Sequence, residues 1–135
     1  MNQVIDDTKK PTNEQQDRLL SNLVKIVNKS SLEMSIILFT PSGVMCGQMI
    51  SAKRYFEETG ALLDDGFKRS FPDFEADKDL SQVLSAAHDN PLFKDGYIHL
   101  LSYKLIDAKG NISNFDNCLW RGKLSEIAGF TLGNF

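Results

Sequence analysis

The alternation of apolar and polar residues in the first half of the chain predicts a β-hairpin. Apolar side chains recur at every second position from Leu32 to Leu38, which places them on one face of a strand. Pro41 presets a turn dihedral and Gly43 tolerates positive φ, so a tight turn is expected between two strands. Residues 32–50 are therefore predicted to form an antiparallel pair.

An amphipathic helix is predicted before this hairpin. Thr12 and Gln15 fit a capping box, in which each side chain satisfies a backbone donor near the other. The helix then runs to about Lys29, with apolar residues recurring at helical spacing. The face expected to pack on the sheet consists of Leu19, Leu20, Leu23, Ile26 and Val27.

A helical insertion at about 52–90 is predicted between the second and third strands. Ser51 is a favourable N-cap for a helix over 52–63, and Gly66 is a plausible exit from it. A second helix is expected over 77–88, followed by a turn. Three phenylalanines in this insertion are expected to be shielded from water together: Phe67, Phe71 and Phe74.

The C-terminal third returns to strands. Residues 97–106 are apolar on both faces, as in a central strand, and a turn at 107–111 leads to a partner strand at 113–120. A last short strand is expected over 124–127. The core is predicted to contain Leu23, Ile26, Val27, Met34, Ile36, Leu38, Leu101, Tyr103 and Leu119.

These elements indicate an α+β fold. An N-terminal helix is expected to accompany a strongly bent antiparallel five-stranded sheet or a small barrel. Residues 12–135 are predicted to form a single globular domain, and residues 1–11 a flexible N-terminal arm.

Composition and charge narrow the classes of partner. The hydrophobic content of 41%, the lack of a long apolar run and the polar N-terminus predict a cytoplasmic protein that neither crosses nor binds a membrane. The net charge of −3 is concentrated in residues 64–79, which carry six acidic and three basic residues. Because phosphate contacts require Lys and Arg, nucleic acid is not expected as a partner.

No residue pattern predicts catalysis, a cofactor or a metal site. Cys46 and Cys118 lie in predicted strands and are expected to be buried free thiols, with a disulfide between them as the alternative. His99 is surrounded by apolar neighbours and is expected to be a structural histidine rather than a general base. The acidic segment 64–79 leaves a metal-binding or small-ligand-binding module as an alternative, although it lacks the spacing of an EF-hand loop.

The C-terminal end is the candidate partner surface. Phe130, Leu132 and Phe135 supply apolar area that a protein partner could cover. Because strands at the ends of a sheet need a cover, a homo-oligomer is also expected, formed through a sheet edge or through residues 129–135.

Two glycines and one C-terminal motif give the chain a resemblance to the Sm-like fold. Gly43 and Gly47 stand in the first hairpin, where Gly47 is expected to mark a bulge or a close strand approach, and Leu119-Trp-Arg-Gly122 is similar to the Arg-Gly turn of the second Sm motif. The resemblance implies a small five-stranded barrel. The Asp and Asn of the family's RNA-binding loop have no counterpart, since Ser51-Ala-Lys-Arg-Tyr55 stands there, so RNA binding remains only a disfavoured alternative.

A second resemblance bears on function. Gly43-Val-Met-Cys-Gly-Gln-Met-Ile-Ser-Ala-Lys-Arg-Tyr-Phe-Glu57 is similar to a segment of the gas vesicle accessory protein GvpU family. The similarity is centred on residues 32–58 and continues more weakly in 97–133. It implies a non-enzymatic, cytoplasmic accessory role in gas vesicle assembly or clustering, with other proteins (gas vesicle proteins among them) and the chain itself as partners, and it transfers no catalytic residues.

Overall fold

The computed structural model describes residues 17–73 and 80–134. In chain order, its elements are α3 (Arg18–Ser30), β1 (Met34–Thr40), β2 (Gly43–Ile50), α4 (Ala52–Ser70), α5 (Leu80–Ala87), α6 (Pro91–Lys94), β3 (Tyr97–Ile106), β4 (Ile112–Lys123), the 3-10 helix η1 (Leu124–Glu126) and β5 (Gly129–Leu132). The flexible arm predicted at 1–11 and the capping box at Thr12 lie outside the described residues. None of the described helices is long and apolar enough to cross a membrane.

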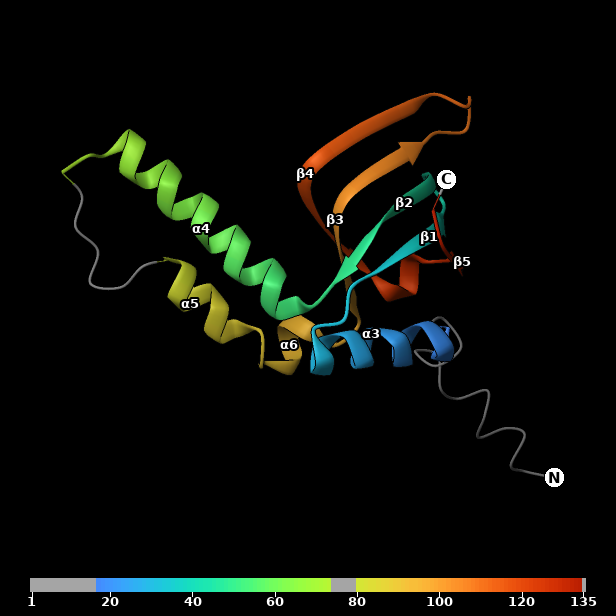
Figure 1. Cartoon of the computed structure of the whole chain (residues 1–135), viewed down its shortest axis with the longest axis horizontal. Coiled ribbons are helices and arrows are strands. Elements are labelled where there is room, and N and C mark those ends of the chain that lie inside the picture. The colour runs from blue at the N-terminus through green and yellow to red at the C-terminus, as the bar shows by residue number, and fades with distance from the viewer. Residues whose placement is uncertain (1–16, 74–79, 135) are drawn as a thin grey trace.

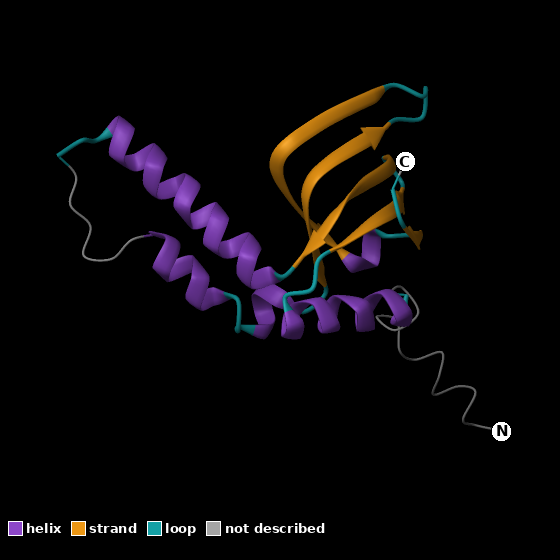
Figure 2. Ribbon diagram, in the orientation of Figure 1, coloured by secondary structure: helices purple, strands orange, loops and turns teal. Residues whose placement is uncertain are grey.

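All five strands join one antiparallel sheet in the order β4-β3-β2-β1-β5. Figures 1 and 2 show a strongly curved sheet, with the helices gathered at one end of it. The predicted α+β class is therefore confirmed, as are the two predicted hairpins. The barrel is not confirmed, because β4 and β5 are the two edges of the sheet and do not pair with each other.

Two irregularities bend this sheet. The register between β2 and β3 shifts at Gly47, where an added Cβ would lie 2.9 Å from Cβ of Tyr103. The register between β3 and β4 shifts at Ser102, which has φ of 52°, and the N–H of Asn117 donates to its Oγ at 2.9 Å. Such bulges increase local twist and bend a strand. The irregularity predicted at Gly47 is thus confirmed.

The first described helix, α3, packs one face on the sheet. The Asp17 carboxylate caps it by accepting from the N–H of Leu19 at 2.8 Å. The residues that it buries are Leu20, Val24 and Val27, at the spacing i, i+4, i+7. Leu19 and Ile26 were predicted on this face but are 61% and 51% exposed, because they lie about one residue's rotation, 100°, away from it.

The long helix α4 begins as predicted but ends later. The Ser51 hydroxyl accepts from the N–H of Arg54 at 3.1 Å and caps its first turn. The helix continues through Gly66 to Ser70, so the predicted exit at Gly66 is wrong. Pro72 explains the actual end, since a proline disfavours helical backbone at the preceding residue.

The phenylalanines of this helix also differ from expectation. Phe67 and Phe71 were predicted to be shielded from water, but their side chains are 41% and 58% exposed. The third, Phe74, lies outside the described residues. Figure 1 explains the exposure, because the second half of α4 extends away from the sheet.

The core lies between α3 and one face of the sheet. Of the predicted core residues, Val27, Ile36 and Leu38 are fully buried, and Leu23, Met34 and Tyr103 pack against the core. Leu101 and Leu119 pair with each other but are only partly buried, outside this core. The bulge at Ser102 is the reason, because it moves the core-facing positions of β3 from Leu100 to Tyr103 and breaks the alternation used in the prediction.

The segment after β4 also departs from the prediction. Residues 124–127 were expected to be a strand, but Leu124–Glu126 is a 3-10 helix. Leu124 and Ile127 are both buried, and their three-residue spacing matches the three residues per turn of a 3-10 helix. The last strand is β5, which pairs with β1 and places Phe130 opposite Leu38. Where a turn was expected after residues 77–88, the short helix α6 begins. The side chain of Asn90 caps this helix by accepting a hydrogen bond from the N–H of Leu92 at 3.0 Å.

Candidate functional site

His99 is enclosed where the first turns of α4 meet β3. Its side chain is 1% exposed, and its ring lies 4.6 Å from the Tyr55 ring and 6.0 Å from the Phe56 ring. Its Nε2 lies 2.8 Å from Nη1 of Arg121. Because arginine only donates, Nε2 accepts and the proton of the neutral ring sits on Nδ1, which is buried without a partner in the described residues.

This environment keeps His99 neutral. Desolvation by burial, followed by the positive charge of Arg121, lowers the pKa of His99 from 6.5 to about 3. The burial and the neutral state fit the structural role that the sequence predicted for it.

Arg121 connects its own strand to two other elements beside this histidine. Its guanidinium carbon lies 3.7 Å from the Tyr97 ring centroid and 5.3 Å from that of Phe56, within the range of cation–π attraction. The Arg-Gly turn expected at 121–122 is wrong, because both residues lie within β4. Arg121 therefore joins β4 to β3 and to α4.

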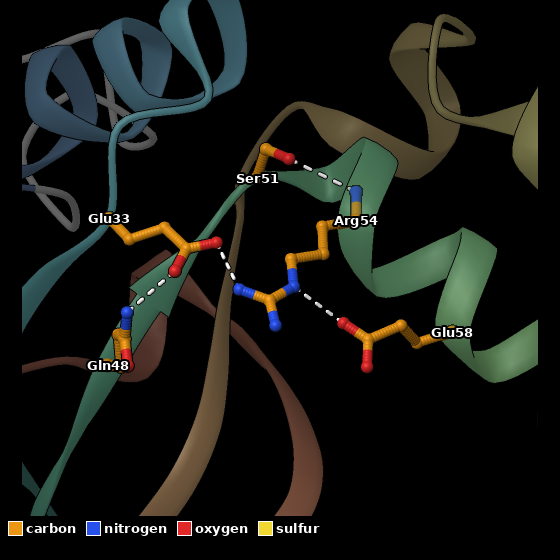
Figure 3. Close-up of polar contacts among 5 residues, drawn as sticks. All are labelled: Glu33, Gln48, Ser51, Arg54 and Glu58. Carbon is orange, nitrogen blue, oxygen red and sulfur yellow. Dashed lines mark hydrogen bonds and ion pairs between the residues drawn. The ribbon is translucent and has the colours of Figure 1, made fainter.

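A second polar cluster fixes the start of α4 (Figure 3). Arg54 pairs with Glu33, and its Nε donates to Oε2 of Glu58 at 2.6 Å. Gln48 on β2 donates to the other oxygen of Glu33 at 2.6 Å. These hydrogen bonds raise the pKa of Arg54, the bond to Glu33 most. Since Arg54 is 38% exposed, solvent screens the pair and we assign it an orienting role, worth about 1 kcal/mol or less.

An apolar cleft of about 380 Å³ lies on the core-facing side of β3 and β4. Tyr103 and Phe115 stack on its wall, with ring centroids 4.8 Å apart and planes 13° apart. Trp120 lines it next to Gly122, where an added Cβ would lie 2.1 Å from the indole ring. The glycine thus makes room for the tryptophan. The other apolar residues of this aromatic cleft are Pro41, Met45, Leu105 and Ile127.

The aromatic cleft is placed to receive an apolar group. Lys123 and Glu126 also line it, and burial raises the pKa of Tyr103, with a smaller contribution from Cys118. Convergence of aromatic walls with a few polar groups is typical of a binding site. This cleft was not predicted from the sequence, because its residues come from the β1–β2 hairpin, β3, β4 and the segment around η1. The aromatic residues at 103, 115 and 120 were the signal that the sequence offered.

The remaining predicted residues lie apart from this cleft. Phe130 is half-buried against the core, Leu132 is 54% exposed at the end of β5, and Phe135 lies outside the described residues. A partner surface there stays a prediction. Cys46 is a buried free thiol as predicted, but Cys118 is exposed, because it lies in the bulged part of the edge strand β4.

The acidic segment falls partly outside the described residues, which omit 74–79. Within the described residues, no group of three or more His, Cys, Asp or Glu side chains could hold a metal ion. Asp65 instead pairs with Arg69 one turn along α4.

Four positions of the segment 43–57 have a clear role in the fold. Gly43 has φ of 145°, and an added Cβ there would lie 2.2 Å from the carbonyl oxygen of Ile106. Gly47 marks the bulge, Ser51 caps α4, and Tyr55 covers His99. The resemblance noted from the sequence therefore includes residues that shape the fold.

Comparison with known proteins agrees with this resemblance over a longer range. The model of the family described as "Gas vesicle protein GvpU-like" matches residues 17–135. No curated protein and no solved structure gives a significant match. Since the matched range takes in every described strand and helix, the chain belongs to the GvpU-like family of gas vesicle proteins.

Proposed function

We propose that this chain is a non-enzymatic accessory protein that acts in the cytoplasm, in gas vesicle assembly or clustering, by binding a gas vesicle protein. Its family supports the gas vesicle context. The observation that carries the binding role is the aromatic cleft, an apolar hollow of about 380 Å³ beside an edge strand.

The partner that this surface suits is an extended apolar segment. β4 is twelve residues long and has β3 as its only strand neighbour among the described residues, so its other edge offers backbone donors and acceptors. A segment added along β4 gains main-chain hydrogen bonds, while one of its side chains enters the cleft between Phe115 and Trp120. The free edge belongs to β4, and Phe115 and Trp120 of the cleft lie on the same strand, so a single peptide can use both together.

The test is capture of partners by a tagged chain in cells that make gas vesicles. The variant Phe115→Lys puts a charge into the cleft and removes the stack on Tyr103, at a folding cost of about 1 kcal/mol. The matched control, Ile112→Lys, adds the same charge to a 60% exposed position of the same strand. We expect the intact chain and Ile112→Lys to capture identified gas vesicle proteins. The folded Phe115→Lys variant should capture at least tenfold less of them. Failure of the intact chain to retain any gas vesicle protein would refute the proposal.

A further inference from the structure

Gly122 lies inside strand β4, where the backbone does not require a glycine. Its φ is not positive, so a residue with a side chain could adopt the same dihedral angles. Glycine is also unfavourable inside a strand, because it has no side chain to pack and loses more conformational freedom on folding than any other residue. The reason for a glycine at this position therefore comes from its surroundings.

The indole of Trp120 occupies the space in which a side chain at position 122 would stand. An added Cβ would lie 2.1 Å from Cη2, 2.5 Å from Cζ2 and 2.8 Å from Cζ3 of this ring. Since atoms do not approach a Cβ so closely, any side chain at 122 would displace the ring. Both residues line the aromatic cleft, so a displacement of the indole would change the shape of the cleft.

The cleft offers a displaced indole room that the core does not. On β3, Leu100 stands opposite Trp120 and is fully buried. Ile98, which stands opposite Gly122, is fully buried as well. Because a protein core is close-packed, it accepts an additional ring only at a large cost. The open cleft adjoins the indole, so a displaced ring would enter the space that the partner's side chain is proposed to use.

We propose that Gly122 is a positioning residue of the aromatic cleft, which it keeps open by seating the Trp120 indole against β4. This role rests on the proposed function, because the cleft is the binding site in that proposal. An alanine at 122 changes no charge and leaves the backbone donors and acceptors of the β4 edge in place. Its effect on binding therefore reports on the cleft rather than on the edge.

Gly122→Ala tests the seat of the indole, and Trp120 reports the result because it is the only tryptophan in the chain. In the intact chain the indole lines an open cleft, where acrylamide reaches the ring and quenches its fluorescence. In Gly122→Ala the ring fills the cleft, so the quenching constant should fall. The matched control for quenching is Gly129→Ala in β5, where an added Cβ would lie at an ordinary 3.9 Å from Cδ2 of Phe39.

Removal of the indole provides the rescue. Gly122→Ala should bind purified gas vesicles about tenfold more weakly than the intact chain, the size of effect expected from the loss of aromatic contacts. In Gly122→Ala/Trp120→Leu, the alanine displaces no ring, so binding should equal that of Trp120→Leu alone. A glycine with a merely structural role would give the same loss with and without the indole, and that result would refute the proposal.

Two further outcomes would overturn the positioning role. Unchanged or increased quenching in Gly122→Ala would show that the ring stays in place or turns towards solvent. A Gly122→Ala chain that does not fold would show that the indole has no second position in the cleft. An intact chain that binds no gas vesicle would instead refute the proposed function, and the quenching comparison would still decide the role of Gly122.

Discussion

The substitution Ile36→Asp is expected to prevent folding. Ile36 is fully buried in β1, opposite Gly47 on one neighbouring strand and Leu132 on the other. Aspartate at this position loses roughly 2–3 kcal/mol of apolar burial, and a buried charge without a partner costs several kcal/mol more. The sum is comparable with the roughly 5–15 kcal/mol that stabilises a typical domain.

Circular dichroism and thermal melting of the purified variant measure this effect. Phe39→Asp is the matched control, because it places the same charge in the same strand on a side chain that is 43% exposed. The control should stay soluble and melt cooperatively, with stability lowered by about 1–2 kcal/mol. A soluble Ile36→Asp protein with a cooperative melt would show that the core lies on the other face of the sheet.

Acid is expected to destabilise the fold through His99. The pKa of His99 is about 3 in the fold and near 6.5 when the ring is exposed, so unfolding takes up a proton at any pH between these values. The free energy of unfolding should therefore be independent of His99 above pH 6.5 and fall by about 1.4 kcal/mol for each pH unit below it. Between pH 6.5 and pH 5, the loss is roughly 2 kcal/mol.

Urea unfolding at a series of pH values from 7.5 to 5 tests this expectation. His99→Phe retains an aromatic ring against Tyr55 but cannot take up a proton. The free energy of unfolding of this variant should therefore depend much less on pH. The control His88→Gln changes a histidine outside the core and should show the same pH dependence as the wild type. A wild-type stability that does not fall between pH 6.5 and pH 5 would contradict the neutral, buried state of His99.

The fold was predictable where a local rule decides the structure. The hairpin at 32–50 follows from period-two apolar residues and a Pro-Ser-Gly turn, and the N-terminus of α4 follows from Ser51. The buried face of α3 could not be predicted in this way, because the helix has apolar residues at more positions than one face can bury. Contact with the sheet, rather than periodicity, selects Leu20, Val24 and Val27 over Leu19 and Ile26.

The candidate site was less predictable than the fold, since it depends on register. Tyr103 meets Phe115 only because the bulge at Ser102 shifts the pairing of β3 and β4, and no local sequence rule places that bulge. The extension of α4 past Gly66 was missed for a related reason. A glycine allows a helix to end but does not force it to end. In α4 the proline at 72 sets the end of the helix.

The most direct test of the proposed function is flotation with purified components. Gas vesicles rise in solution, so a chain that binds one of their proteins rises with them, and the bound fraction can be measured in the floating layer. We expect the intact chain and Ile112→Lys to float with the vesicles, and Phe115→Lys to remain in the lower solution. An intact, folded chain that remains in the lower solution, or Phe115→Lys that floats as well as the intact chain, would contradict binding through the aromatic cleft.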